Sequence, residues 1–243
     1  MSKLYIRVIS DVVCPWCFIG KRRLERALRM LPEGIATEVH WAPFQLNPGM
    51  PPEGIARMQY RTAKFGSLER SRQLDLQVAR AGAEEEINFA FDRISRTPNT
   101  FRAHRLIRLG TLEGVGNTVV EGLFRAYFVD AADVGDPDVL TVVASEAGID
   151  ASRARHFLEG EDGAAEVCAE EEEIRRLGVT GVPLFVIDDR FQISGAQPSE
   201  ILVETLLRAG QNIGWPSNPL RMPASRRLTK ISGEDRGRVA GER

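Results

Sequence analysis

The chain has 243 residues, of which 43% are hydrophobic and 27% are charged, and its formal net charge is −2. This length allows one large or two small globular domains. No apolar stretch is long enough to cross a membrane, and the near-neutral charge gives no reason to expect a nucleic-acid partner. Three cysteines are too few for a disulfide scaffold in a chain of this length.

The first predicted strand, at residues 4–9, leads into the segment Cys14-Pro15-Trp16-Cys17. From Pro15 to about residue 31, apolar residues recur at helical spacing. The two cysteines are therefore expected at a strand-to-helix junction, with Cys14 near the N-cap and Cys17 one turn inside the helix. Proline suits the first helical position, because its missing N–H would be unpaired there.

This placement of the thiols predicts redox chemistry. The partial positive charge at a helix N-terminus stabilises a thiolate, so we expect a moderately lowered pKa for Cys14. A thiolate attacks disulfides, and Cys17 is close enough to close the pair and release a bound substrate. Met1 runs almost directly into the first strand, without a secretory signal. We therefore expect a cytoplasmic protein, in which such a pair is more often catalytic than structural.

Two other interpretations of the cysteine pair are half of a zinc site and an inert structural pair. Zinc usually needs four ligands, and the histidines at His40, His104 and His156 lack metal-ligand spacing. No metal is therefore expected. The third cysteine, Cys168, lies in a predicted helix, where we expect it to be buried and inert, and the charged run 170–173 is expected to face solvent.

A second strand is predicted at residues 36–44. The proline-rich segment 47–52 can hold neither a helix nor a central strand, so it marks a boundary. From about residue 55 the pattern is almost wholly helical, although residues 84–96 fit either a short strand or a loop. The predicted helices, separated by glycine and proline breakers, are at residues 54–65, 68–81, 100–113, 117–128, 137–147, 151–158 and 164–177.

Strands return near the end of the chain. The apolar segment 182–188 is predicted to be a strand that turns into a short antiparallel strand at residues 191–193. Gly195 ends that strand, and a last helix is predicted at residues 198–210. The polar, basic residues that follow, 213–243, are expected to form a flexible tail.

The order of these elements fits an α/β class protein with a thioredoxin-like fold and a large all-helical insertion. Four segments are predicted. Residues 1–50 would form the first part of the thioredoxin-like domain, 51–177 the helical insertion, 178–212 the second part of the thioredoxin-like domain, and 213–243 the tail.

The same segments resemble a known family. Residues 11–21, which contain Cys-Pro-Trp-Cys, resemble the active-site segment of the DsbA family of thioredoxin-fold oxidoreductases, and most closely its FrnE-like branch. Residues 178–186 resemble the family's cis-proline segment, 98–106 a motif in its helical insertion, and 194–197 the loop before its last helix. The resemblance extends over roughly residues 3–210.

The resemblance implies a role for each matching position. Cys14 would be the nucleophile, Cys17 the resolving thiol, and Pro183 a cis-proline facing both sulfurs. The backbone of Val182 would pair with an extended substrate. The residues expected to contact substrate are Pro15, Trp16, Asn99, His104, Val182, Gly195 and Ala196.

Asn99 and His104 also have simpler interpretations. Asn99 precedes a predicted helix and could serve only as its cap. His104 lies one turn into that helix and could be an ordinary packed or surface residue. In the alternative that the resemblance implies, both face the sulfurs and His104 tunes the thiolate.

The resemblance extends to 2-hydroxychromene-2-carboxylate isomerases and kappa-class glutathione transferases, which typically carry serine at the first C-x-x-C position. Because both cysteines are present, we predict thiol–disulfide exchange with protein or small-molecule disulfides, with no cofactor required. Glutathione is an alternative redox partner, held by Val182 and by the Gly195-Ala196 amides. A glutathione-dependent enzyme for a small aromatic or polyketide-like substrate and a redox-switched binding module stay open as alternatives, and the apolar helical face is either a lid or a homodimer surface.

Overall fold

The computed structural model describes residues 3–211. The tail predicted at residues 213–243 lies outside the described residues. Within the described part, no helix is both long and apolar enough to span a lipid bilayer.

The centre of the fold is a four-stranded mixed sheet in the order β2-β1-β5-β6. β1 (Leu4–Ser10) pairs in parallel with β2 (Thr37–Pro43) on one side and antiparallel with β5 (Leu184–Ile187) on the other. β5 continues into β6 (Phe191–Ser194) as an antiparallel hairpin. The pairing brings the end of β1 beside the start of β5, so two segments far apart in the sequence meet at the same end of the sheet.

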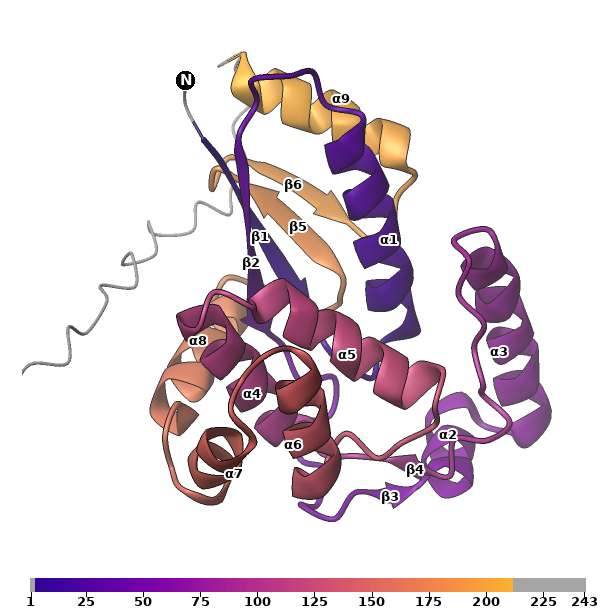
Figure 1. Ribbon diagram of the computed structural model, residues 1–243. Coiled ribbons are helices and arrows are strands. Elements are labelled where there is room, and N and C mark those ends of the chain that lie inside the picture. The colour runs from indigo at the N-terminus through magenta and orange to yellow at the C-terminus, as the bar shows by residue number, and fades with distance from the viewer. Residues whose placement is uncertain (1–2, 212–243) are drawn as a thin grey trace, which may run out of the picture.

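Two helices accompany this sheet. α1 (Pro15–Arg29) follows β1, and α9 (Ser199–Gly210) packs against α1 and also contacts β1 and β6. In Figure 1 both helices lie on the same side of the sheet, and the first turn of α1 points toward the remaining helices. The chain therefore places the start of α1 between the sheet and the helical segment.

The helical segment between β2 and β5 contains the seven predicted helices. The helix predicted at 54–65 begins later, because Ile55–Ala56 forms β3, which pairs with β4 (Arg96–Thr97). Residues 84–95 form a loop, and β4 follows it. The helices are α2 (Arg57–Phe65), α3 (Leu68–Ala83), α4 (Phe101–Leu112), α5 (Gly116–Phe128), α6 (Pro137–Glu146), α7 (Ala151–Glu159) and α8 (Ala164–Arg176).

An aromatic cluster joins α1 to the helical segment. The ring of Phe18, one residue after Cys17, stacks on Phe124 at 5.1 Å between centroids and meets Phe89 edge to face at 6.1 Å. Phe128 completes the cluster. Phe18 and Phe124 are fully buried, and burial of one such side chain stabilises a fold by roughly 1.5–3 kcal/mol. This cluster fixes the first turn of α1 against α5.

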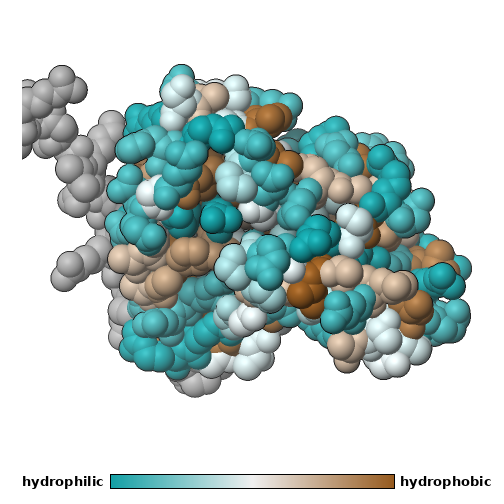
Figure 2. Space-filling model, turned by 90° about the horizontal axis from the view of Figure 1, so that it is seen from below, coloured by the Kyte–Doolittle hydropathy of each residue, from teal (hydrophilic) through white to brown (hydrophobic). Residues whose placement is uncertain are grey.

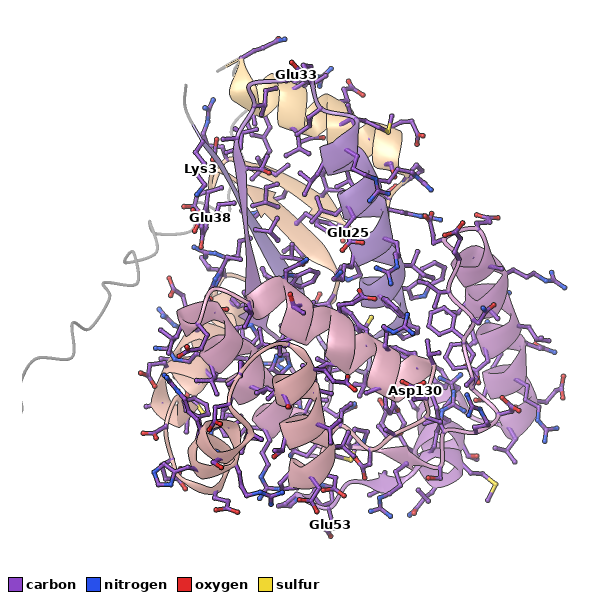
Figure 3. All side chains as sticks on the ribbon, in the orientation of Figure 1. Lys3, Glu25, Glu33, Glu38, Glu53 and Asp130 are labelled. Carbon is purple, nitrogen blue, oxygen red and sulfur yellow. The ribbon has the colours of Figure 1, made fainter. Side chains whose placement is uncertain are left out.

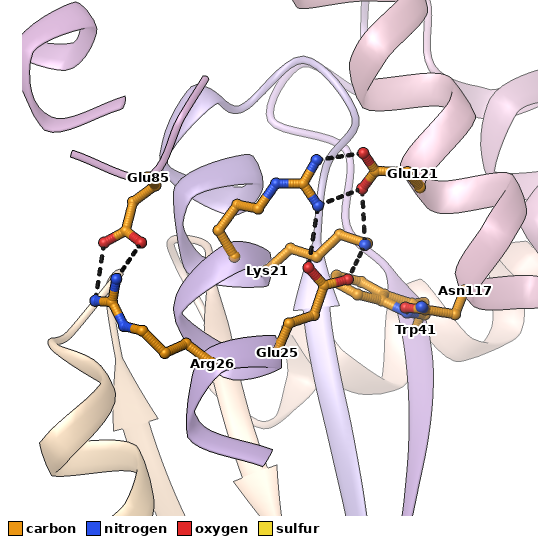
Figure 4. A network of polar contacts seen from close by, with 8 residues as sticks. Lys21, Glu25, Arg26, Trp41, Glu85, Asn117 and Glu121 are labelled. Carbon is orange, nitrogen blue, oxygen red and sulfur yellow. Dashed lines mark hydrogen bonds and ion pairs between the residues drawn. The ribbon is translucent and has the colours of Figure 1, made fainter. Parts of the chain in front are cut away.

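A buried ionic network reinforces the same junction (Figure 4). Lys21 on α1 is 2% exposed and donates to Glu25 and, at 2.8 Å, to Glu121 on α5. Arg22 donates to the same two carboxylates. Burial raises the pKa of Glu121, but the hydrogen bonds and charges of Arg22 and Lys21 outweigh it and hold that pKa below its ordinary value. On the other side of α1, Arg26 pairs with Glu85 at 2.8 Å.

The outer surface is mostly hydrophilic where Figure 2 shows it, with hydrophobic residues in small separate groups. At the β2 edge of the sheet, Lys3 and Glu38 lie next to one another (Figure 3) and form an ion pair of 2.8 Å. Both side chains are more than half exposed, so this pair contributes only about 0–1 kcal/mol.

Two predictions for α8 are wrong. Cys168 is exposed, and Glu171, in the run expected to face solvent, is buried. The reason is helical phase, because Val167, Glu171 and Ile174 form the inward stripe and Cys168 lies one position, about 100°, away from it. Glu171 is satisfied in the interior because it accepts hydrogen bonds from the Gln45 backbone and from Arg175.

Candidate functional site

The two cysteines lie at the start of α1, as the sequence predicts. Cys14 is the N-cap residue, with extended φ and ψ of −94° and 110°, and Pro15 is the first residue of the helix. The backbone N–H of Cys14 donates to the Asp11 carbonyl, and that of Cys17 donates to the Cys14 carbonyl, both at 3.0 Å. Both side chains are buried free thiols, 5% and 1% exposed. A rigid turn therefore presents the pair at a helix N-terminus.

The two thiols have different surroundings. Burial raises the pKa of Cys17 well above its ordinary value, and the hydrogen bond with Cys14 and the charges of Cys14 and Asp11 raise it further. A backbone hydrogen bond with Asp11 acts in the opposite direction but is weaker. Cys14 instead forms part of the wall of a cavity. The geometry therefore favours Cys14 as the first thiol to react and Cys17 as the one that keeps its proton.

The Val182–Pro183 peptide bond is cis, as the family resemblance implies. The Cys14 thiol lies 3.6 Å from the Val182 carbonyl oxygen, to which it donates. A side chain at Gly20 of α1 would lie 3.2 Å from the Pro183 ring, so glycine permits this close approach. The structure thus brings Cys14, Val182 and Pro183 together from opposite ends of the chain.

Gly195 and Ala196 lie behind this segment. The Gly195 N–H donates to the Pro183 carbonyl at 2.8 Å, and the Ala196 carbonyl accepts from Arg23 at 2.6 Å. The Gly195 amide, expected from the resemblance to hold a substrate carboxylate, is therefore engaged within the chain. These contacts fix the loop against α1.

His104 lies beside Asp11, at the end of β1. The His104 Nε2 and Asp11 Oδ1 atoms are 3.5 Å apart, and the side chains are only 2% and 1% exposed. Neither atom has a hydrogen-bond partner, whereas the other Asp11 oxygen accepts from the Leu46 N–H at 2.8 Å. A cavity of about 20 Å³, roughly the volume that one water molecule requires, connects His104 with His40 and Glu170. His104 is thus packed in the interior next to a group that touches Cys17.

Asp11 is the functional candidate that the sequence interpretation missed. Its position directly before the turn to the cysteines is visible in the sequence, but its proximity to His104 depends on how α4 packs against the sheet, where it contacts β2. Asn99 lies one residue before Thr100, the N-cap residue of α4. Its side-chain oxygen accepts from the Phe101 N–H at 2.9 Å, and its amide donates to the Met50 carbonyl at 2.6 Å, so it ties the start of α4 to the preceding loop. Contact of Asn99 with substrate stays a prediction.

A cavity of about 290 Å³ opens beside Cys14. Pro15 and Trp16 form its rim on the α1 side, and Trp16 is 40% exposed. The opposite wall comes from α2, from α3 and from residues 91–97. Within residues 3–211, no group of three or more histidine, cysteine or acidic side chains is placed to hold a metal ion.

Comparison with known proteins gives a consistent family. The model of the DSBA-like thioredoxin domain matches residues 5–207. The chain is 30% identical over 209 residues to the uncharacterized protein YwbO of Bacillus subtilis, covering 84% of this chain and 96% of that protein. The structure of a probable DsbA oxidoreductase, SCO1869 from Streptomyces coelicolor, is 33% identical and has a TM-score of 0.80, covering 88% and 93% of the two chains. The fold is also that of a cytosolic disulfide reductase, DsbM from Pseudomonas aeruginosa, with GSH (20% identity, TM-score 0.55, coverage 84% and 99%).

Proposed function

Because the chain belongs to the DsbA-like thioredoxin-domain family, we propose that it is a thiol–disulfide oxidoreductase that exchanges disulfides through Cys14 and Cys17. The observation that carries this proposal is the arrangement of the two thiols. Both lie at the start of α1, opposite a cis-proline, and only Cys14 borders an open cavity. Because members of one fold family differ in chemistry, the arrangement of these residues supports the exchange activity more directly than the fold does.

Exchange takes place in two steps. The Cys14 thiolate attacks one sulfur of a substrate disulfide, which forms a mixed disulfide and releases the other substrate sulfur as a thiolate that takes up a proton. Cys17 then loses its proton and attacks the Cys14 sulfur. The second substrate thiol leaves, and two electrons have passed from the protein dithiol to the substrate. The same steps run in reverse oxidise a dithiol, and the relative reduction potentials decide the direction.

The second step requires a proton acceptor, because Cys17 is buried and its pKa is raised. The Asp11 backbone hydrogen-bonds with Cys17, and the Asp11 charge is one of those that raise the pKa of Cys17. The His104 ring lies 3.5 Å from the Asp11 carboxylate. We assign Asp11 as the acceptor and His104 as the residue that positions it and passes the proton toward the small cavity. A general base of this kind typically contributes about 10²–10⁴-fold to a rate.

Substrate is held by the segment around the cis-proline. The Val182 carbonyl accepts the Cys14 thiol in the free protein, so this backbone lies within reach of any group bonded to that sulfur. We propose that Val182 and Pro183 align the substrate, while Pro15 and Trp16 contact it at the rim. No cofactor is required. We place the protein in the cytoplasm, as DsbM is described, and glutathione is the natural thiol partner to test there. A homodimer stays a prediction.

Mixed-disulfide trapping tests the two roles. Cys17→Ser, in a Cys168→Ser background, is expected to accumulate a stable mixed disulfide with glutathione disulfide or a disulfide-containing peptide, visible as an added mass. The Cys14→Ser variant in the same background is expected to trap none. Equal trapping through both cysteines would contradict the assigned order. A glutathione-dependent small-molecule enzyme would instead keep turnover in Cys14→Ser, and a redox-switched binding module would show no turnover of disulfides at all.

A further inference from the structure

The cavity beside Cys14 has a chemically uneven lining. One part is apolar and aromatic, with side chains from α1, α3, the segment around Phe91 and the end of α5. The other part is cationic and is formed by Arg57, Arg61 and Lys64 of α2. The apolar lining residues are Val13, Pro15, Trp16, Leu46, Phe65, Leu74, Val78, Phe91, Ile94 and Phe128. Neutral polar side chains also line the cavity, at Asn47, Tyr60, Gln77, Thr97 and Tyr127.

The cations come from one face of α2. Their spacing of four and then three residues places them on successive turns along a single stripe. The lining contains one carboxylate, Asp75, against these three cations. Arg57 and Arg61 both pair with Asp75, at 2.9 and 2.7 Å, so a single negative charge serves two guanidinium groups.

The excess of positive charge is partly buried. The side chains of Arg57 and Arg61 are each 14% exposed. Burial lowers the pKa of Arg61, and repulsion from Arg57 lowers it further, whereas the charge of Asp75 acts against both. Lys64 donates to the Tyr60 hydroxyl at 2.6 Å, a neutral acceptor, and its ammonium lies 5.1 Å from the Tyr60 ring. A bound anion would therefore offset an excess of positive charge carried in part by two mostly buried guanidinium groups.

We propose that this cavity selects small disulfides whose sulfur carries an apolar, aromatic-sized group bearing a carboxylate, with the carboxylate bound by Arg61 and Lys64. The inference rests on the proposed exchange activity and specifies its substrate class. A volume of about 290 Å³ lies at the small end of ligand sites, which favours a compact substrate over a protein segment.

The reaction is the exchange already described. The reduced protein gives two electrons to the disulfide, which leaves as two aromatic thiols, and the Cys14–Cys17 disulfide forms. The carboxylate takes no part in the covalent steps. Its contribution is to hold the substrate sulfur beside Cys14, so it affects how strongly one disulfide is preferred over another.

Two aromatic disulfides test this preference: 5,5′-dithiobis(2-nitrobenzoate), which carries a carboxylate on each ring, and 4,4′-dithiodipyridine, which is uncharged near neutral pH. The ratio of their second-order rate constants with the reduced protein is divided by the same ratio for N-acetylcysteine. The wild type is expected to prefer the carboxylate strongly. The ratio should fall about tenfold in Arg61→Gln/Lys64→Gln and a few-fold in Lys64→Gln, because each lost charge removes an attraction to the anion.

Two controls distinguish a failure of the proposed carboxylate site from a failure of the exchange activity itself. Arg72→Gln removes an exposed cation of α3 that does not line the cavity, so its ratio should match the wild type. Lys64 is itself exposed, so Lys64→Gln tests the idea even where loss of Arg61 disturbs folding. An unchanged ratio in Lys64→Gln and the double variant, or an equal fall with both disulfides, would overturn the carboxylate site. A wild type that reacts with neither disulfide faster than N-acetylcysteine would overturn the exchange activity instead.

Discussion

The first turn of α1 and the helix α2 lie on opposite sides of the same cavity and are built differently. Cys17, Phe18, Ile19 and Gly20 are all buried, whereas α2 has no buried residue. The reacting groups are thus held by a packed core, whereas the α2 side chains that line the cavity are partly or fully exposed. This contrast suggests that chemistry is fixed by the core, whereas substrate preference can change through surface-accessible substitutions on α2.

The aromatic cluster behind α1 should give the largest effect on stability. Phe124→Ala removes a fully buried ring that stacks on Phe18, and the expected loss is roughly 3–5 kcal/mol of unfolding free energy. Chemical denaturation measures it. Val142→Ala, on the exposed face of α6, should change stability by less than about 0.5 kcal/mol. A loss below about 1 kcal/mol for Phe124→Ala would mean that this core does not fix α1.

Removal of the Asp11 charge should slow only one step of exchange. In Asp11→Asn, the first release of aromatic thiol, by Cys14, is expected to keep its rate, whereas the second, by Cys17, should slow by about 100-fold or more. Stopped-flow measurement of the two phases against pH provides the test. Because Cys17 has a raised pKa, the second phase of the wild type should accelerate as pH rises, and the variant should show a different profile.

His104→Gln should slow the same phase less, because this residue acts through Asp11. Equal slowing of both phases in Asp11→Asn would contradict its role as proton acceptor. A second phase with unaltered rate and pH profile would do so as well.

Disruption of the ionic network between α1 and α5 should lower the unfolding free energy by less than Phe124→Ala does. Glu121→Gln leaves Lys21 buried beside Glu25 alone, and we expect a cost of about 1–3 kcal/mol, less than for a fully buried pair because Glu121 is 24% exposed. Glu38→Gln, which breaks the exposed pair with Lys3, should cost less than about 1 kcal/mol.

The effect of acid on Glu121 follows from its lowered pKa. Its contribution is present above the ordinary carboxyl pKa and is lost as pH falls through the folded-state value. The difference in unfolding free energy between the wild type and Glu121→Gln should therefore become smaller as the pH is lowered. A difference in unfolding free energy that grew at low pH would contradict the pairing of Glu121 with Lys21 and Arg22.

Local stability should differ between the two sides of the cavity. Amide hydrogens in the first turns of α1 are expected to exchange slowly, and those of α2 much faster, because α2 has few buried contacts. Hydrogen exchange followed by mass spectrometry checks this. Similar protection in both helices would remove the contrast between a packed and an exposed side.

Local patterns in the sequence predict much of this site. Cys14 at the N-cap and Pro15 at the first helical position follow from residues within a few positions of one another, whereas the cis-proline at Pro183 was implied by the family resemblance. The α/β class and the order of strands around the helical segment were predictable for the same reason, because periodicity and breakers are local.

Features that depend on packing were not predictable. The burial of Glu171 and the exposure of Cys168 depend on which face of α8 meets the rest of the fold. The Asp11–His104 contact joins the segment after β1 to α4. The sequence shows that Arg57, Arg61 and Lys64 share one face of α2, but only the tertiary structure shows that they line the same cavity as Cys14. Helical spacing shows that residues share a face, but tertiary contacts decide what that face meets.

The most direct test of the account is the equilibrium between the Cys14–Cys17 pair and glutathione, followed by mass. We predict a reversible two-electron couple with a reduction potential within the span of known exchange enzymes, about −120 to −270 mV. Cys14→Ser and Cys17→Ser should each abolish it, and Cys168→Ser should leave it unchanged. A pair that never forms an internal disulfide, and carries glutathione on Cys14 alone, would contradict the exchange mechanism.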